Sequence, residues 1–175
     1  MKILLIISGS IAAYKALDII RTLKKRNYTI NCILSKHGEK FITPLSVTSL
    51  SGNPVYTDSN ALDTYNNIKH ISITRNSDII LVAPATANII AKTAYGIADD
   101  FSTSVLIAAN IPIIMAPAMN PHMWQSKANQ RNIRILESDN VKIIPPEYGY
   151  TTCGEKGYGK MANVQKIVKF IENLK

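Results

Sequence analysis

Short apolar runs recur along the chain and alternate with segments in which apolar residues return every three or four positions. The runs are brief and rich in β-branched residues, which is typical of buried strands in a parallel sheet. They are KILLIIS (2–8), TINCILS (29–35), DIILVA (78–83), IPIIMA (111–116) and VKIIP (141–145). The pattern predicts an α/β fold, Rossmann-like (flavodoxin-like), in which helices cover both faces of a doubly wound parallel sheet in three α/β/α layers.

The helical segments between these runs have recognisable ends. Thr43 and Pro44 suit the N-cap and first turn of a helix that ends at Gly52, and Gly96 is a natural stop for another. The C-terminal segment has one apolar face, which indicates a closing amphipathic helix. The period of 70–78 is ambiguous and assigns no element. The predicted helices span 11–27, 43–52, 85–96 and 163–175.

One connection is long for a compact domain. Residues 145–161 read PPEYGYTTCGEKGYGKM, rich in glycine, proline and tyrosine. Loops of this length are usually functional or disordered, and the aromatic residues argue against disorder. We interpret 145–161 as a mobile flap on a single domain that spans 1–175.

Composition narrows the class of protein. The 46% hydrophobic content and 175 residues suit one globular domain, and no apolar run approaches the roughly 20 residues of a membrane span. Ser8 and Gly9 interrupt the first run before any signal-peptide pattern forms. Two cysteines, Cys32 and Cys153, are too few for a disulfide scaffold. We expect a cytoplasmic protein that does not associate with membranes.

The net charge of +8 suits an acidic partner. The lysines are scattered and no nucleic-acid motif accompanies them, so we expect no nucleic-acid partner. The charge either attracts a phosphorylated small molecule or reflects a compositional bias toward lysine.

Candidate binding residues follow the strands, where ligands of doubly wound sheets bind. Gly9 and Ser10 lead into a helix whose N-terminal amides suit a phosphate, and Ser35 ends the second run. The pattern G-x-G-x-x-G is absent, which argues against a standard NAD site and leaves a mononucleotide. A tight turn and a capping serine are the structural alternatives. Residues 84–88 suit a flat ring, unless Thr86 is only a helix cap.

Two side chains are candidates for proton transfer outside the carboxylates, namely His70 and Cys153. A structural histidine is the alternative at His70, and Cys32 reads as a small buried hydrophobe. The loop PAMNPHMW (117–124) places the uncharged Asn120 in apolar surroundings. Such a loop is too apolar for a solvated connection and predicts either a ligand site or a core plug.

Five motifs occur in a familiar order: GSIAAYK, FITPLS, APATAN, PAMNPHMW and CGEKGYGKM. With them, essentially the whole chain resembles the flavin-dependent cysteine decarboxylases, and in particular the branch that converts 4'-phosphopantothenoylcysteine to 4'-phosphopantetheine and CO2 in coenzyme A biosynthesis. The resemblance implies FMN as cofactor, no metal, a homo-oligomer built of trimers (homotrimer or homododecamer) and active sites between adjacent subunits. It also implies hydride transfer to the flavin, which yields a thioaldehyde that loses CO2 to form an enethiolate.

The resemblance also implies residue roles. His70 would assist deprotonation, Cys153 would donate the proton after CO2 loss, and Asn120 would bind the substrate carboxylate. Further substrate contacts are implied for Met119, Lys160 and Met161. The implied flavin contacts are Gly9, Ser10, Ile11, Ala12, Ser35, Pro84, Ala85, Thr86, Ala87 and Asn88.

The chain departs from the family in two places. Lys160 stands where relatives commonly have arginine, so a point charge replaces a bidentate group. The sequence ends at Lys175 after one closing helix, so we expect phosphopantothenate–cysteine ligase activity on a separate chain. A peptidyl-cysteine decarboxylase and a non-catalytic flavin-binding subunit remain alternatives.

Overall fold

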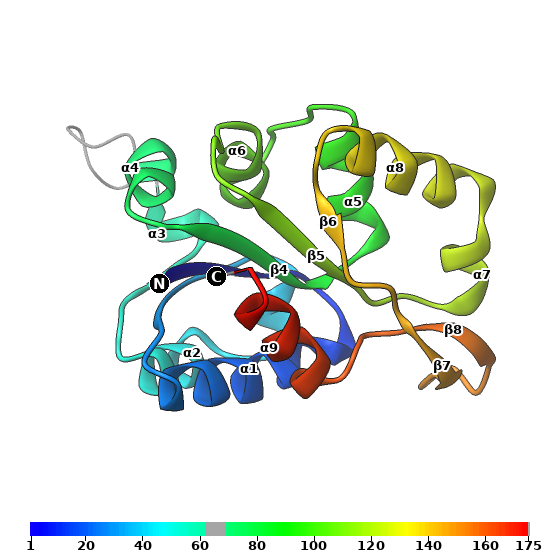
Figure 1. The fold of residues 1–175 in the computed structure, drawn as a ribbon, viewed down its shortest axis with the longest axis horizontal. Coiled ribbons are helices and arrows are strands. Elements are labelled where there is room, and N and C mark those ends of the chain that lie inside the picture. Colours follow the sequence, from blue (N-terminus) through cyan, green and yellow to red (C-terminus); the bar gives the residue numbers. More distant parts are fainter. Residues whose placement is uncertain (62–68, 175) are drawn as a thin grey trace.

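The central element is a parallel sheet with the strand order β3-β2-β1-β4-β5-β6 (Figure 1). The structure, a computed structural model, describes residues 1–61 and 69–174. The doubly wound fold is confirmed, and the order is that of Rossmann folds rather than the 2-1-3-4-5 order of flavodoxin. The strands are β1 (Lys2–Ile7), β2 (Thr29–Leu34), β3 (Val55–Tyr56), β4 (Ile79–Ala85), β5 (Ile113–Pro117) and β6 (Lys142–Ile143).

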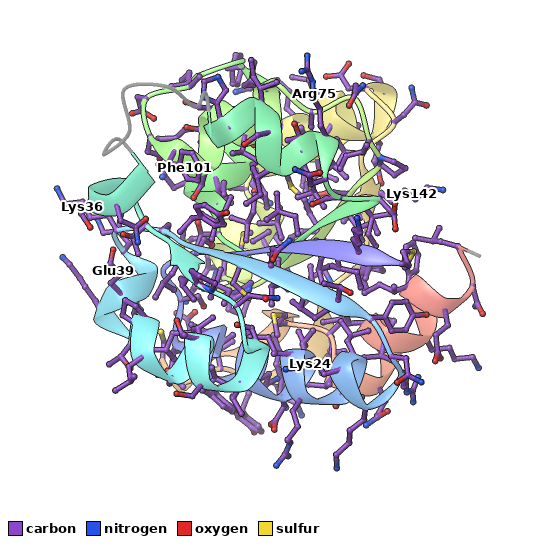
Figure 2. All side chains as sticks on the ribbon, turned by 90° about the vertical axis from the view of Figure 1, so that its left-hand side faces the viewer. Lys24, Lys36, Glu39, Arg75, Phe101 and Lys142 are labelled. Atoms are coloured by element: carbon purple, nitrogen blue, oxygen red, sulfur yellow. The ribbon has the colours of Figure 1, made fainter. Side chains whose placement is uncertain are left out.

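Helices cover both faces of the sheet (Figure 1). Along β1 the side chains alternate, so that Leu5 packs against one helical layer and Leu4 and Ile6 against the other. All three are fully buried, and Figure 2 shows side chains filling the space on both sides of the sheet. The first layer holds α1 (Tyr14–Lys25), α2 (Pro44–Ser51) and α9 (Val164–Glu172); the second holds α4 (Lys69–Arg75), α5 (Ala87–Ala94), α6 (Phe101–Ile107) and α8 (Lys127–Ser138).

The predicted helix ends are largely confirmed. The Thr43 hydroxyl accepts from the Ser46 N–H at 3.2 Å, Pro44 begins α2, and Gly52 ends it with φ 73°. The helix predicted over 85–96 begins at Ala87, because Ala85 still belongs to β4. The ambiguous segment 70–78 contributes to α4 and then leads into β4.

Shorter elements lie at the carboxyl edge of the sheet and in the connections. They are the 3-10 turns η1 (Ile11–Ala13) and η2 (Gly38–Lys40) and the short helices α3 (Asp58–Ala61) and α7 (Pro121–Gln125). Among the described residues, no helix is long and apolar enough to cross a membrane.

The connection 145–161 is an antiparallel hairpin of β7 (Glu147–Tyr150) and β8 (Lys156–Lys160). The hairpin lies beside α7 (Figure 1), and the Met119 N–H donates to the Gly159 carbonyl at 2.9 Å. No strand was predicted here, because β8 has no apolar pattern. Its backbone is held instead by close approach to the loop before α7. A Cβ on Gly159 would collide with the Met119 carbonyl, and φ there is 156°.

Candidate active site

A cavity of about 540 Å³ opens at the carboxyl edge of the sheet, where β1 and β4 lead to helices on opposite faces. In doubly wound sheets this switch point is the usual ligand site. Its walls come from the ends of three strands and from α5, α6 and the loop before α7. They include Ser8, Gly9, Ser10, Ser35, Lys36, His37, Asp58, Thr86, Ala87, Asn88, Lys92, Asp100, Ser102, Ala118, Met119 and Met123.

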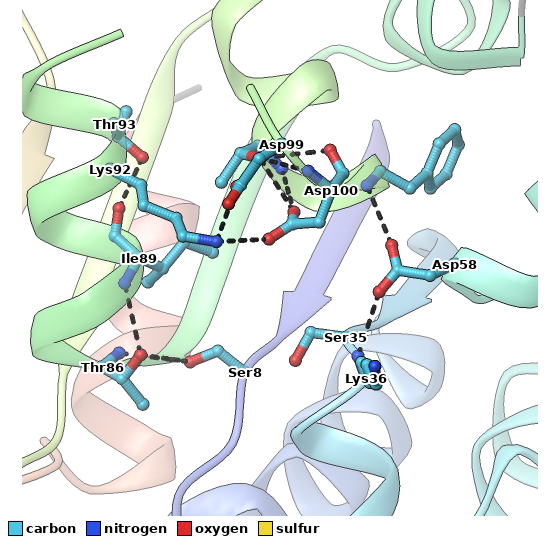
Figure 3. A network of polar contacts seen from close by, with 12 residues as sticks. Ser8, Ser35, Lys36, Asp58, Thr86, Ile89, Lys92, Thr93, Asp99 and Asp100 are labelled. Carbon is cyan, nitrogen blue, oxygen red and sulfur yellow. Dashed lines mark hydrogen bonds and ion pairs between the residues drawn. The ribbon is translucent and has the colours of Figure 1, made fainter. Parts of the chain in front are cut away.

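Ser8 connects the carboxyl ends of β1 and β4, the two strands on either side of this cavity, by hydrogen bonds. Its buried hydroxyl donates to the Pro84 carbonyl at 2.6 Å and accepts from the Thr86 N–H at 3.2 Å. The Thr86 hydroxyl caps α5 by accepting from the Ile89 N–H at 3.4 Å, so the cap alternative is confirmed (Figure 3). Ser8 therefore contributes rigidity, and its donor is already used within the protein.

Ser10 and Ser35 present hydroxyls on the same wall. Ser10 Oγ accepts from the Ala12 N–H at 3.2 Å and Ser35 Oγ accepts from the Gly38 N–H at 3.1 Å. Because each hydroxyl is an acceptor in these contacts, its own hydrogen is left to donate. The segment at Gly9 runs so close to the β2 side that a Cβ there would lie 2.9 Å from the His37 carbonyl carbon. The chain thus forms a tight cradle with hydroxyl donors.

The opposite wall is acidic (Figure 3). Asp58 accepts from the Phe101 N–H at 2.9 Å and from the Lys36 N–H at 3.3 Å, and so joins α3 to α6 and to the end of β2. Lys92 donates to Asp99 at 2.6 Å and to Asp100 at 3.1 Å.

The ion pairs set the charge state of this wall. The hydrogen bond to Asp99 is the main cause that raises the pKa of Lys92. Burial opposes ionisation of Asp100, but hydrogen bonds from Thr103 and Lys92 outweigh it and lower the pKa of this carboxyl. Lys92 and Asp100 therefore form a charged pair at neutral pH.

A second cavity of about 240 Å³ lies beneath the hairpin and shares Ser10, Ala118 and Met119 with the first. The two spaces therefore adjoin along the start of α1 and the end of β5. The remaining wall consists of Ile11, Ala12, Tyr14, Lys15, Asn120, Tyr150, Thr151, Thr152, Cys153, Gly159, Lys160 and Met161.

Hydrogen bonds at both the oxygen and the nitrogen of its amide fix the orientation of the Asn120 side chain. As the N-cap of α7, its Oδ1 accepts from the His122 N–H at 2.8 Å. Its Nδ2 donates to the carboxylate of Glu155 in the hairpin turn, which also lies 3.7 Å from His122 Nε2. The side chain is thus fixed with its donor directed at a carboxylate.

The two cysteines lie in contrasting environments. Cys32 is fully buried in β2, and burial raises the pKa of its thiol to about 12. Cys153 is exposed in the hairpin turn and borders the second cavity. Cys32 is the small buried residue that the sequence predicts, and only Cys153 is accessible for chemistry.

The structure brings most predicted site residues together. Within one chain, His70 is half-buried on α4 and lines neither of these two cavities. Pro84 and Ala85 also line neither, because they lie inside β4, whereas Ile11 and Ala12 face the second cavity and not the first. The other predicted positions border one cavity or both.

Several residues of the cavity walls were not predicted from the sequence. Lys36 and His37 directly follow β2, so the rule that ligands bind beyond strand ends was a usable signal. Asp58 follows β3, a strand too short to recognise. Asp100 is the N-cap of α6 and follows no strand, and Lys15 lies in the motif GSIAAYK but was not singled out within it.

Comparison with known proteins decides the family. The profile of the family described as Flavoprotein matches residues 1–175. The chain belongs to the Flavoprotein family.

Two curated proteins are similar to this flavoprotein over nearly its whole length. A Streptococcus mutans protein named "Probable phosphopantothenoylcysteine decarboxylase" is 40% identical over 98% of this chain and 97% of its own length. The "Coenzyme A biosynthesis bifunctional protein CoaBC" of Bacillus subtilis is 41% identical over 97% of this chain, which spans only 42% of that longer protein.

Solved structures share the fold of the flavoprotein. A mutant PPC decarboxylase complexed with pantothenoylaminoethenethiol has a TM-score of 0.88 at 27% identity, with 99% of this chain and 97% of that chain covered. The FMN-dependent cysteine decarboxylase SpaF has a TM-score of 0.85 at 26% identity, with 100% and 98% covered.

The first cavity fits a flavin. Its volume lies in the range of ligand pockets, and the hydroxyls of Ser10 and Ser35 have donors to spare. The cradle at Gly9 has no room for a side chain, which leaves the backbone open to a ligand phosphate. The residues of this cavity therefore fit a flavin phosphate.

We expect the two thiols to differ sharply in reactivity. In the folded flavoprotein a thiol reagent should modify only Cys153, because Cys32 is buried and its pKa is about 12. Absorbance with a chromogenic disulfide at pH 8 should report one thiol per folded chain and both after unfolding in urea. The folded Cys153→Ser variant should give no change in absorbance. Equal labelling of both cysteines in the folded protein would contradict the burial.

Gly9→Ala should weaken flavin binding. The added Cβ would press on His37 across the cradle, and overpacking of this kind costs about 1–3 kcal/mol, or about tenfold or more in affinity. Gly149→Ala is the matched control, because its Cβ would make only an ordinary 3.6 Å contact with Lys160. Titration of flavin into the apoproteins, with quenching of flavin fluorescence as readout, measures the difference. If Gly9→Ala bound flavin with wild-type affinity, the prediction that the cradle at Gly9 binds the flavin would be wrong.

Proposed function

We propose that the protein is an FMN-dependent decarboxylase that converts 4'-phosphopantothenoylcysteine to 4'-phosphopantetheine and CO2. The observation that carries the proposal is the adjacency of the two cavities, which share Ser10, Ala118 and Met119. A flavin in the first cavity would lie next to a substrate held by Asn120 and Cys153 in the second. The curated relatives support the substrate, and the structural neighbours support the cofactor.

FMN is the flavin that this cavity favours. The chain lacks the G-x-G-x-x-G pattern that binds a dinucleotide pyrophosphate, and its cradle at Gly9, Ser10 and Ser35 suits one phosphate. The carboxylates of Asp58 and Asp100 on the opposite wall offer acceptors and no donor to a second phosphate. They suit hydroxyl or N–H groups of the cofactor instead.

Asn120 is placed to receive the carboxylate that is lost. Its amide already donates to the Glu155 carboxylate, so its direction suits this group. A neutral donor orients a carboxylate without the ionic stabilisation that a lysine would give the ground state. The substrate carboxylate would displace Glu155, and the apolar Met119 would leave it few competing partners.

Loss of CO2 from a saturated carbon needs an acceptor for the electron pair that remains. When bound, FMN would supply a reversible hydride acceptor: hydride leaves the carbon that bears sulfur, so that this carbon can accept the electron pair, and returns to the substrate when the product forms. After CO2 leaves, the carbon must gain a proton, and Cys153 in the hairpin turn is the thiol on the cavity wall that can provide it.

His70 requires a second copy of the chain in this proposal. It lies on α4 and lines neither cavity of its own chain, so it would reach the substrate from an adjacent subunit and assist deprotonation there. A homo-oligomer built of trimers, in the cytoplasm, is the assembly we propose. Because CoaBC proteins are bifunctional and longer, we also propose that the phosphopantothenate–cysteine ligase is a partner activity.

The first test is turnover by the flavin-loaded protein. Incubation with 4'-phosphopantothenoylcysteine should give 4'-phosphopantetheine by mass spectrometry, and Asn120→Ala should lower the rate about a hundredfold because orientation is lost. Asn110→Ala, on an exposed loop that lines neither cavity, is the control.

Other outcomes select the alternatives. Product from a peptide that ends in cysteine, and not from the small molecule, would identify a peptidyl-cysteine decarboxylase. No product from either, in a folded and flavin-loaded protein, would indicate a non-catalytic flavin-binding subunit. Full activity in Asn120→Ala would contradict the assignment of the carboxylate site.

Cys153→Ser should separate CO2 release from completion of the reaction. Without the thiol the intermediate gains its proton slowly, so CO2 should still form while a species lighter than 4'-phosphopantetheine by one hydrogen molecule accumulates. Mass spectrometry of a single turnover measures both. Cys32→Ala is the control, because Cys32 is in the core and should yield the full product. Normal product from Cys153→Ser would exclude the thiol as the proton donor.

A further inference from the structure

The carboxylate of Glu155 lies at the position proposed for the carboxylate of the substrate. Asn120 Nδ2 donates a hydrogen bond to it, and the other end of the amide is fixed because Oδ1 accepts from the His122 N–H at 2.8 Å. Glu155 belongs to the turn of the hairpin and is half-buried, whereas Asn120 is the N-cap of α7. The donor that would receive the substrate is therefore already paired with an anion of the same kind.

Hydrogen bonds within the turn fix the backbone of Glu155. Its carbonyl accepts from the Thr151 N–H at 2.9 Å and from the Thr151 hydroxyl at 3.2 Å, and the Gly154 N–H donates to the Thr151 carbonyl at 3.0 Å. Gly154 has φ 81°, a left-handed conformation that glycine adopts without strain. The turn that carries Cys153 is thus closed on itself, so Glu155 can leave Asn120 by rotation of its side chain alone.

Glu155 has a nearby alternative partner. His122 Nε2 lies 3.7 Å from its Oε1, and among the described residues this is the one titratable nitrogen within ion-pair range of the carboxylate. The next residue, Lys156, turns its ammonium group to the rings of Tyr148 and Tyr150, whose centroids lie 5.9 and 5.5 Å away. A displaced Glu155 side chain would therefore move toward His122.

We propose that Glu155 competes with the substrate carboxylate for the Asn120 amide, and that this competition weakens ground-state binding of the group that leaves as CO2. The inference rests on the proposed function, which assigns Asn120 to that carboxylate. The amide nitrogen has two hydrogens, but two carboxylates on one nitrogen would repel each other, so the substrate displaces Glu155. The substrate thus gains a charge-assisted hydrogen bond only at the expense of one within the protein.

The competition ends when CO2 forms. The reacting carboxylate loses its negative charge as its bond to carbon breaks, so it binds the amide more weakly and Glu155 returns to Asn120. An interaction regained on the way to the transition state lowers the barrier, whereas one made only in the ground state raises it. The product has no carboxylate and keeps no hold on Asn120, which also favours its release. Glu155 acts through Asn120 and is a positioning residue.

Glu155→Gln tests the competition in turnover. The carboxamide has nearly the same size but no charge, so it competes weakly for the Asn120 amide. For 4'-phosphopantothenoylcysteine, KM and kcat should both fall about tenfold while kcat/KM changes little, because the bound substrate is stabilised and the transition state is not. Glu137→Gln, on the exposed surface of α8, removes the same charge and should leave both constants unchanged. A KM that stays the same or rises in Glu155→Gln would contradict the competition.

A binding measurement separates this inference from the function itself. Two unreactive ligands lack sulfur: 4'-phosphopantothenoylalanine keeps the carboxylate, and 4'-phospho-N-ethylpantothenamide lacks it. In calorimetric titrations of the flavin-loaded proteins, Glu155→Gln should bind the first about tenfold more tightly than the wild type does, and the second with equal affinity. Combination of Glu155→Gln with Asn120→Ala should abolish the gain, because the contested donor is gone.

The two measurements fail in different ways. If the wild type binds both ligands and does not decarboxylate 4'-phosphopantothenoylcysteine, the proposed function is wrong, and the titration still decides the competition. If the wild type binds neither ligand, the function and the competition are both wrong. Equal affinity of the wild type and Glu155→Gln for 4'-phosphopantothenoylalanine would overturn the inference whatever the turnover.

Discussion

The parallel pairing of β1 with β4 is the constraint on which the rest of the structure depends. These two strands are neighbours in the sheet, yet the chain leaves them toward helices on opposite faces. A crevice must therefore open between their carboxyl ends. Ser8 holds that crevice in shape by bonding the Pro84 carbonyl and the Thr86 N–H, so the first cavity has a rigid base before any ligand arrives.

Backbone contact with the hairpin has the same importance for the second cavity. β8 approaches the loop before α7 so closely that Gly159 has no room for a side chain. This contact carries Cys153 and Lys160 to the side of the cavity that faces Asn120 and Lys15. The second cavity is thus a product of hairpin docking, whereas the first is built into the sheet.

The two cavities differ in the charged residues that line them. Asp58 and Asp100 line one wall of the first cavity together with Lys36 and Lys92, and Lys15 and Lys160 border the second. In the proposed function the phosphate of the cofactor lies at the cradle, away from these carboxylates. In the proposed function the anionic substrate occupies the second cavity, and Met119 borders both spaces.

Local sequence signals determined much of this protein. The apolar runs and the ends of α2 and α5 follow from patterns a few residues long, because strand burial and helix capping depend on near neighbours. The same signals predicted Gly9, Ser35 and Thr86 at strand ends, and the motifs around Asn120 and Cys153 carried the family resemblance.

Only the tertiary structure decided the contacts between distant segments. The hairpin lacks an apolar pattern and is held by backbone contact with Met119, so it was read as a loop. Lys15 and Lys160 border one cavity although 145 positions separate them in the sequence (160 minus 15), and the carboxylate of Glu155 accepts from the amide of Asn120. His70 is the converse case, because its motif is recognisable while its own chain does not bring it to either cavity. Local patterns encode elements, whereas a site depends on which surfaces the sheet order and the hairpin bring face to face.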